Sequence, residues 1–565
     1  MAHLPRATDQ APPTSSRTDV VRGFARTHAL MGVFVVVGLV LRVLTTLAYR
    51  PAMQFVQDSF DYLHDAEQLV PSVIRPLGYP IFLRLLSVTG RLGVVPVVQH
   101  LLGLAVGVLI YLLLQRLGAR SWLAALGAAP ILLDGYQVYL EQFVLAETLF
   151  VFLVVSALFV LLWADRPPPA ACAAAGVLMA AAALTRTVGV FLLLPVAAYV
   201  VARRLGVRRL ACLVVPAAVV LGGYASWFHA HHGQYRLVAY DGYFLAGRVA
   251  PFADCTRLRL PPPQEALCDK KLASERPGAD HYTFMPGSPL RRPYVAAGTD
   301  RNAVAGSFAR HVIRNQPGEY LSTVAAALAH YFSPSRTTGP GDYPAQMLHF
   351  RTEHTPQPWE PLYPPADPYV GQWTWPGPTM SYGTVVAAHG FGMAEVRPSL
   401  DAPLARHLRS YQRYGYTPGP LLALALVVGL VAGCGRIPAH LRRLRWAAAT
   451  FAGCALLALL VASATVGFDY RLLMPALALL PPAGIIGASL VERRLGRPTL
   501  SDRHHGRGPG EPVRPTASSS SAADNVHEGA HDDREERAVG GPAGGENGAH
   551  PGGRRSLRSR SGGGS

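Results

Sequence analysis

Ten apolar runs constrain this chain more than any other feature of its sequence. They fall at residues 29–49, 95–115, 121–134, 143–163, 170–185, 187–202, 209–228, 418–435, 446–466 and 471–491. A helix needs about 20 apolar residues to span a bilayer, so runs of this kind predict transmembrane segments. Of the 565 residues, 50% are hydrophobic and only 15% are charged, whereas soluble domains carry about 25% charged residues. The sequence therefore predicts an all-α polytopic membrane protein with about ten transmembrane helices.

Arginines in the loops predict the orientation of these helices. The positive-inside rule places short arginine-rich loops in the cytoplasm, which puts both termini there. The net charge of +17 is explained by these loops, so we expect no nucleic-acid partner. The predicted inner arginines are Arg17, Arg22, Arg26, Arg116, Arg120, Arg166, Arg203, Arg204, Arg208, Arg209, Arg436, Arg442, Arg443, Arg445, Arg493, Arg494 and Arg497, whereas the predicted outer turns at 134–142 and 467–470 contain none.

Composition also indicates where the protein resides. Only two of the 52 basic side chains are lysines, Lys270 and Lys271, and alanine, glycine and proline are abundant. This usage is typical of a high-GC bacterial genome, so we expect a multi-pass protein of the bacterial plasma membrane, in contact with membrane lipids. Residues 1–27 are polar, and the first apolar run is too long for a cleavable signal, which predicts a signal anchor.

Two segments lie outside the predicted helix bundle. The longer is rich in proline, tyrosine and tryptophan, has helical stretches near 301–315, 319–332 and 399–414, and holds Cys255 and Cys268. A segment of this length is predicted to be an ordered outer domain, where a disulfide between the two cysteines can form. The other is a polar tail that cannot bury a core. The predicted domains are a cytoplasmic segment (1–27), a transmembrane module (28–228) with an acidic first outer loop (50–94), the outer domain (229–417), C-terminal transmembrane helices (418–491) and a disordered cytoplasmic tail (492–565).

The first predicted outer loop carries a cluster of carboxylates. On a helix, Asp58, Asp61 and Asp65 fall within about 60° of one another, and Phe55 and Tyr62 lie close to the same face. Mutual repulsion is expected to raise the pKa of at least one of them, and such a carboxylate suits a general base acting on a hydroxyl. The alternative is an amphipathic surface helix with a solvated acidic face.

A tight turn follows in Arg75-Pro76-Leu77-Gly78-Tyr79-Pro80. Two prolines and a glycine within six residues predict a fixed turn, which can return the chain to the membrane near Asp58. A simple re-entry turn without a role in the site is the alternative.

Further polar residues gather at the same predicted side. Glu141 lies in an outer turn, and Glu147 lies near the start of an apolar run, where an ionisable group is costly and marks a candidate site. Arg186 and Arg471 border outer turns against the positive-inside rule, and Asp469 is beside Arg471. A guanidinium can bond two oxygens of a phosphate at once. The alternatives are a carboxylate bonded to a helix end, arginines that bind ordinary phospholipid, and a simple Asp469–Arg471 pair.

Together these segments resemble the GT-C superfamily of integral membrane glycosyltransferases, in particular bacterial members related to protein O-mannosyltransferases and aminoarabinose transferases. The resemblance covers about residues 28–230 and 418–491. The resemblance rests on the motifs Asp58-Ser59-Phe60-Asp61-Tyr62, Arg75-Pro76-Leu77-Gly78-Tyr79-Pro80, Leu145-Ala146-Glu147-Thr148-Leu149-Phe150, Leu184-Thr185-Arg186 and Tyr470-Arg471-Leu472-Leu473-Met474-Pro475.

The resemblance implies transfer of a sugar from a polyprenyl-phosphate donor to a glycan, lipid or protein acceptor of the envelope, at the outer face. One-step attack from the opposite face of the sugar is then expected to invert the anomeric centre. The resemblance also implies Asp58 as the base, with Asp61 as the second candidate. Carboxylates can also hold Mg²⁺ or Mn²⁺, although the sequence shows no complete ligand set. The phosphate-binding candidates are Arg75, Arg186 and Arg471, and the supporting candidates are Tyr62, Tyr79, Glu141, Glu147 and Asp469.

Two other classes of function fit a polytopic envelope protein. A flippase or transporter of lipid-linked sugars tends to place charges near the bilayer midplane in broken or repeated helices, whereas here the unusual charges gather at one face. An envelope polymer assembly protein without transferase activity also suits the large outer domain.

Overall fold

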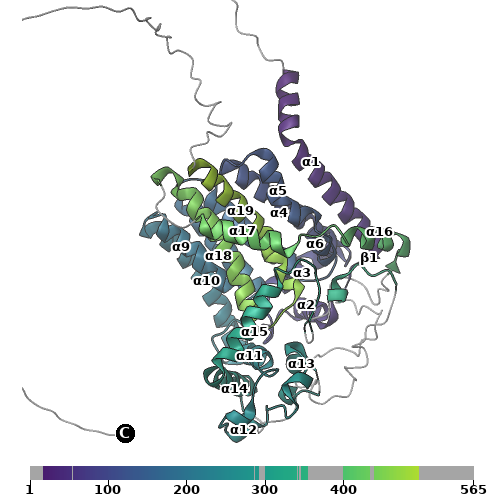
Figure 1. Ribbon diagram of the computed structural model, residues 1–565, viewed down its shortest axis with the longest axis vertical. Helices are drawn as coiled ribbons and strands as arrows, with labels where there is room; N and C mark the ends of the chain where they lie inside the picture. The colour runs from purple at the N-terminus through teal and green to yellow at the C-terminus, as the bar shows by residue number, and fades with distance from the viewer. Residues whose placement is uncertain are drawn as a thin grey trace, which may run out of the picture. The chain divides into compact units, whose positions relative to one another are not determined.

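The computed structural model describes residues 17–494, apart from residues 54, 286, 292–298, 340–341, 343–344, 354–398 and 433–437. Predicted segments up to residue 16 and from residue 495 onward lie outside these described residues. All described residues belong to one compact unit. It is helical apart from two short strands, β1 (Tyr49–Arg50) and β2 (Ser399–Leu400), which pair antiparallel. The predicted all-α class is confirmed (Figure 1).

Each of the ten predicted apolar runs coincides with a helix. Among the described helices, five contain a stretch long and apolar enough to cross a bilayer, namely α1, α4, α10, α18 and α19. The other five are 13 to 17 residues long. The ten helices are α1 (Arg17–Ala48), α4 (Val94–Arg116), α5 (Ser121–Leu133), α7 (Glu147–Leu162), α8 (Pro169–Thr185), α9 (Gly189–Ala202), α10 (Val207–His232), α17 (Gly419–Val431), α18 (Arg442–Thr465) and α19 (Met474–Arg494).

Small residues allow the apolar helices to pack closely. Helix α8 packs against α7, α9 and α10, and α19 packs against α5, α17 and α18. A Cβ atom at Gly176 would lie 2.1 Å from the carbonyl oxygen of Leu213, and one at Gly487 would lie 2.7 Å from that of Val428. In a membrane, the hydrophobic effect does not drive helices together, because lipid tails are as apolar as the side chains. Helices associate there through close packing, which small residues allow.

Shorter elements connect the apolar helices. Helices α2 (Val56–Gln68) and α3 (Gly78–Leu86) follow α1, and α6 (Gly135–Leu140) lies between α5 and α7. The segment between α10 and α17 is called the outer segment here, after its predicted location. The helical stretches expected in it coincide with α14, α15 and α16, its longest described helices. The described α-helices between α10 and α17 are α11 (Asp241–Val249), α12 (Pro262–Glu265), α13 (Ala279–Phe284), α14 (Arg301–Asn315), α15 (Pro317–His330) and α16 (Ala402–Gln412).

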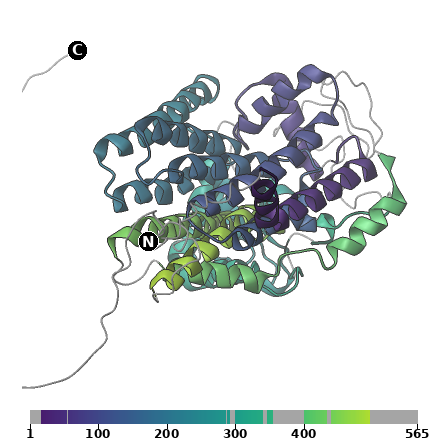
Figure 2. The ribbon, with the colours of Figure 1, turned by 90° about the horizontal axis from the view of Figure 1, so that it is seen from above.

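The end of the outer segment is fastened to the helix bundle at two places. Strand β2 pairs with β1 at the end of α1, and Figure 2 shows α1 (purple) and α16 (green) side by side there. The Asp134 carboxylate accepts hydrogen bonds of 2.8 Å from both the Arg336 guanidinium and the Thr417 backbone N–H. These contacts return the chain from the outer segment to α17 beside the end of α5.

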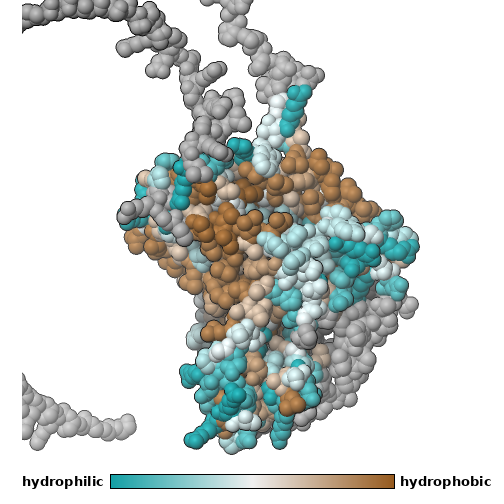
Figure 3. Space-filling model, viewed as in Figure 1, coloured by the Kyte–Doolittle hydropathy of each residue, from teal (hydrophilic) through white to brown (hydrophobic). Residues whose placement is uncertain are grey.

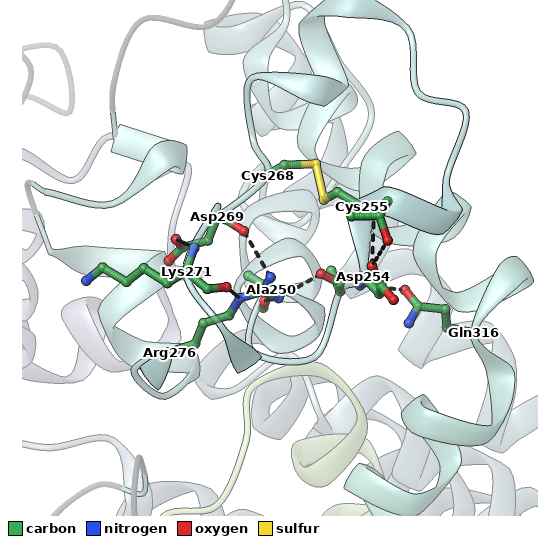
Figure 4. Close-up of a disulfide and its surroundings, with 10 residues drawn as sticks. Ala250, Asp254, Cys255, Cys268, Asp269, Lys271, Arg276 and Gln316 are labelled. Carbon is green, nitrogen blue, oxygen red and sulfur yellow. Dashed lines mark hydrogen bonds between the residues drawn. A yellow bond between two sulfur atoms is a disulfide. The ribbon is translucent and has the colours of Figure 1, made fainter. Parts of the chain in front are cut away.

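The outer segment has its own apolar core, and its loops are cross-linked. Tyr243 and Phe308 are buried where α11 and α14 pack together. Cys255 and Cys268 are bonded to each other, with their Cα atoms 6.2 Å apart. Beside them the Arg276 guanidinium donates to several carbonyl oxygens of the same loops (Figure 4). The part of this segment that the structure describes therefore packs around a core of its own.

The surface separates into apolar and polar regions. In the view of Figure 3, hydrophobic residues gather over α9, α10 and α17, whereas the surface over α11, α12 and α14 is mostly hydrophilic. Large apolar side chains such as Leu194, Val219 and Leu424 are at least 60% exposed. Apolar exposure on this scale fits helices that face lipid rather than water.

The close contact of α8 with α10 leads to a stability prediction. Gly176→Ala forces a methyl group into the Leu213 carbonyl, and overpacking of this kind costs about 1–3 kcal/mol, so we expect a lower apparent Tm in detergent. Gly222→Ala on α10 is the matched control, because a Cβ atom there meets nothing within 4 Å and alanine favours the helix. Differential scanning fluorimetry of both variants checks this; equal Tm values would contradict the packing argument.

Candidate active site

Most of the predicted site residues line one cavity of about 960 Å³. The cavity lies where α2, the turn before α3, the α8–α9 junction and the segment before α19 meet. Further lining comes from α7 and α18 and from the outer segment, including residues of α11, α13 and α15. The predicted residues in its lining are Asp58, Asp61, Tyr62, Arg75, Glu147, Arg186, Asp469 and Arg471.

Helix α2 is fixed to the bundle by a buried serine. The Ser59 hydroxyl accepts a hydrogen bond from the Phe55 backbone N–H at 2.8 Å and donates to the Val144 carbonyl at 2.9 Å. The Val144 N–H in turn donates to the Met53 carbonyl at 3.0 Å. Because Ser59 is fully buried, these bonds set the position of its neighbour Asp58 in the first turn of α2.

Arg75 joins two of the clustered carboxylates. Its guanidinium donates to Asp58 at 2.6 Å, forms an ion pair with Asp61, and lies over the Tyr62 ring, 5.2 Å from the ring centroid. The turn that carries Arg75 is held by Gly78, where a Cβ atom would lie 2.5 Å from the Leu184 carbonyl oxygen. Glycine at this position therefore allows the turn to pack against the end of α8. The turn also brings the chain back toward Asp58, as predicted from the sequence.

The segment before α19 contributes the second partner of Asp58. Arg471 donates from Nη1 to Asp58 Oδ2 at 2.6 Å and from Nε to Asp469 Oδ2 at 2.6 Å. Asp469 Oδ1 also accepts the Arg471 backbone N–H at 2.8 Å, which fixes the local turn. Gly467 precedes this turn with φ +135°, a conformation that favours glycine.

Arg186 and Glu147 extend the same network. Arg186 Nη1 lies 2.5 Å from Glu147 Oε1, and Arg471 Nη1 lies 3.8 Å from the same oxygen. Glu147 is the first residue of α7 and is buried, so an anionic carboxylate there needs these cations. Three guanidinium groups and four carboxylates thus form one continuous network at the cavity, with the arginine side chains 16–23% exposed.

Burial and charge set the acidities within α2. Burial alone would raise the pKa of Asp58, but Arg75 and Arg471 together outweigh it and hold that pKa below its usual value. Burial raises the pKa of Asp61 to about 7 against the pull of Arg75, and burial raises that of Asp65 to about 7. The raised pKa expected in this cluster is present, although desolvation contributes more than mutual repulsion.

Glu141 and Tyr79 lie outside the cavity lining. The fully buried Glu141 receives two hydrogen bonds of 2.8 Å from Arg42, a residue that the sequence analysis did not single out. His100 and Gln137 each bond the same carboxylate at 2.9 Å. The Tyr79 hydroxyl donates to Gln99, and its ring contacts Tyr62 edge-on. The sequence feature that could have indicated this network is Arg42, a charged residue inside the first apolar run.

The outer segment supplies cavity residues that the sequence did not reveal. Among them are Arg248 on α11, Asp280 on α13, His330 on α15 and Asp342. No sequence motif marks them, because their position depends on how the outer segment folds. Among the described residues, no group of three histidine, cysteine, aspartate or glutamate side chains is arranged to hold a metal ion.

The buried network supports a prediction about stability. Glu141→Gln leaves the Arg42 guanidinium without a counter-charge, and breaking a buried pair costs about 3–5 kcal/mol, so we expect a large fall in apparent Tm. Glu492→Gln is the control, because the Arg120–Glu492 pair is 41% and 29% exposed and such pairs contribute about 0–1 kcal/mol. Thermal unfolding of both variants measures this, and similar small shifts would refute a structural role for Glu141.

Comparison with known proteins finds a match to a family model. Residues 95–215 match the family model described as dolichyl-phosphate-mannose-protein mannosyltransferase, a GT-C family. No curated protein and no solved structure gives a significant match to the chain. The matched residues run from α4 into α10 and include Glu147 and Arg186. The match agrees with the resemblance drawn from the sequence motifs, and it supports a membrane glycosyltransferase that uses a polyprenyl-phosphate sugar donor.

Proposed function

We propose that this chain transfers a sugar from a polyprenyl-phosphate donor to an acceptor hydroxyl on the outer face of a bacterial plasma membrane. The observation that carries this proposal is the convergence of Arg75, Arg186 and Arg471 on one cavity that also contains Asp58. The name of the matched family makes mannose the first donor sugar to test. The acceptor is an envelope glycan, lipid or protein.

The three arginines suit the phosphate of the donor. Each guanidinium carries five N–H donors, and several of them are engaged by Asp58, Asp61, Glu147 and Asp469. A lipid phosphate competes for the same donors and forms charge-assisted hydrogen bonds of its own. The carboxylates therefore hold the arginines in position before the donor arrives.

Asp58 is suited to act as the base. It is ionised at neutral pH, because Arg75 and Arg471 together keep its pKa low despite burial. When the donor phosphate takes over N–H groups of these arginines, the carboxylate loses part of this stabilisation and becomes more basic. It then accepts the proton of the acceptor hydroxyl as that oxygen attacks the anomeric carbon.

The reaction is a single displacement. The bond between the anomeric carbon and the phosphate oxygen breaks while the acceptor oxygen bonds to the opposite face, so the configuration inverts. The leaving polyprenyl phosphate is already stable as an anion and needs no general acid. Arg75, Arg186 and Arg471 stabilise the charge that grows on it.

Substitution of the proposed base tests the mechanism. We expect Asp58→Asn to lower kcat for transfer from polyprenyl-phosphate mannose by about 100-fold or more, the usual contribution of a general base. Asp65→Asn is the matched control, since Asp65 lies on the same helix outside the cavity lining, and it should keep near wild-type activity. If Asp61→Asn abolished transfer while Asp58→Asn retained it, Asp61 would be the base.

Substitution of the proposed phosphate ligands gives a separate prediction. Arg186→Gln and Arg471→Gln each remove a charged hydrogen-bond donor, so the KM for the donor should rise by about 10- to 100-fold. Arg236→Gln, at an exposed ion pair of the outer segment, should leave this KM unchanged. Steady-state kinetics with varied donor concentration distinguishes the two site variants from the control. An unchanged donor KM in all three variants would show that Arg186 and Arg471 do not bind the donor phosphate.

A further inference from the structure

One carboxylate of the cavity comes from the outer segment and is not explained by binding of the donor phosphate. Asp280 lies in the first turn of α13 and lines the same cavity as Asp58 and Arg471. No sequence motif marks Asp280, and it has no part in the proposed transfer step.

The position of Asp280 is fixed by close packing on both sides of α13. A Cβ atom at Gly247 of α11 would lie 2.0 Å from the Thr283 hydroxyl and 3.0 Å from the Ala279 carbonyl oxygen, so α13 lies directly on α11. A Cβ atom at Gly467 would lie 3.6 Å from that of Ala279. The start of α13 therefore lies against the turn that leads to Asp469 and Arg471.

Asp280 differs from the other cavity carboxylates in its bonding. Those assigned to the site are each paired with an arginine: Asp58, Asp61, Glu147 and Asp469. Asp342 accepts the Gly339 N–H at 2.8 Å. Asp280 has no hydrogen-bond or ion-pair partner within the part of the chain that the structure describes, so its oxygens remain available to a ligand in the cavity.

We propose that Asp280 binds the acceptor, accepting a hydrogen bond from a hydroxyl group next to the one that is glycosylated. This inference rests on the proposed transferase function and adds the class of acceptor that the cavity selects: neutral and hydroxyl-bearing at the site of attack.

The charges around Asp280 support this assignment. Burial, together with nearby Asp469, Asp58 and Asp342 and against the opposing charge of Arg471, raises the pKa of Asp280 to about 7. A position surrounded by three carboxylates disfavours a phosphate or carboxylate group. The anionic donor is therefore directed to the arginines, and an anionic acceptor is disfavoured at Asp280. One cavity can in this way keep its two substrates apart by charge.

Kinetics with matched acceptors test the role of Asp280. The full-length protein is given polyprenyl-phosphate mannose with either n-octyl α-D-mannoside or its 6-phosphate, and donor hydrolysis is followed without acceptor. We expect Asp280→Asn to raise the KM for the neutral acceptor by about 10-fold, the effect of losing a charged hydrogen-bond partner. The preference for the neutral over the phosphorylated acceptor should shrink by a similar factor, while donor KM and donor hydrolysis stay unchanged.

Asp300→Asn is the matched control. Asp300 is another outer-segment aspartate, caps α14 and lies outside the cavity lining, and asparagine is an equally good cap. A misfolded outer segment would raise both KM values, so the unchanged donor KM separates binding from a structural role. An unaltered acceptor KM and preference in Asp280→Asn would overturn this inference alone. Failure of the wild type to consume the donor with either acceptor would overturn the proposed function as well.

Discussion

The ion pairs that Asp58 forms with Arg75 and Arg471 are the interaction on which the candidate site depends. Arg471 precedes the last apolar helix and lies 413 residues from Asp58 in sequence. Arg75 comes from the turn that returns the first outer loop to the bundle. Without the carboxylate, these guanidinium groups would repel one another at the cavity. Without the arginines, a buried carboxylate would lose the charges that keep it ionised.

A second, fully buried network holds the frame around this site. Glu141 binds Arg42 of α1, and the adjacent Gln142 donates to the Tyr49 carbonyl at 2.6 Å. Together with the bonds of Ser59, these contacts connect α1, the segment before α7 and α2. The two networks have different roles. The buried network fixes the helices, and the partly exposed network at the cavity keeps hydrogen-bond donors that a phosphate can reach.

The sequence was most informative where local patterns determine structure. Apolar runs predicted the ten helices, and the sidedness of Asp58, Arg186 and Arg471 predicted that they share one site. It could not show that Glu141 belongs to a separate buried network, because its partner Arg42 lies 99 residues away. Nor could it place Asp280, whose position follows from packing between α11, α13 and the turn at Gly467. Such contacts between distant segments leave no periodicity in the chain.

The most direct test of the account is a cryo-EM structure with a non-hydrolysable polyprenyl-phosphonate mannose analogue bound. We expect phosphonate oxygens within hydrogen-bond distance, about 2.7–3.2 Å, of at least two of Arg75, Arg186 and Arg471. We also expect the anomeric carbon to face the space beside Asp58. A phosphonate bound elsewhere on the helix bundle, with the Asp58–Arg471 pair unchanged, would contradict it.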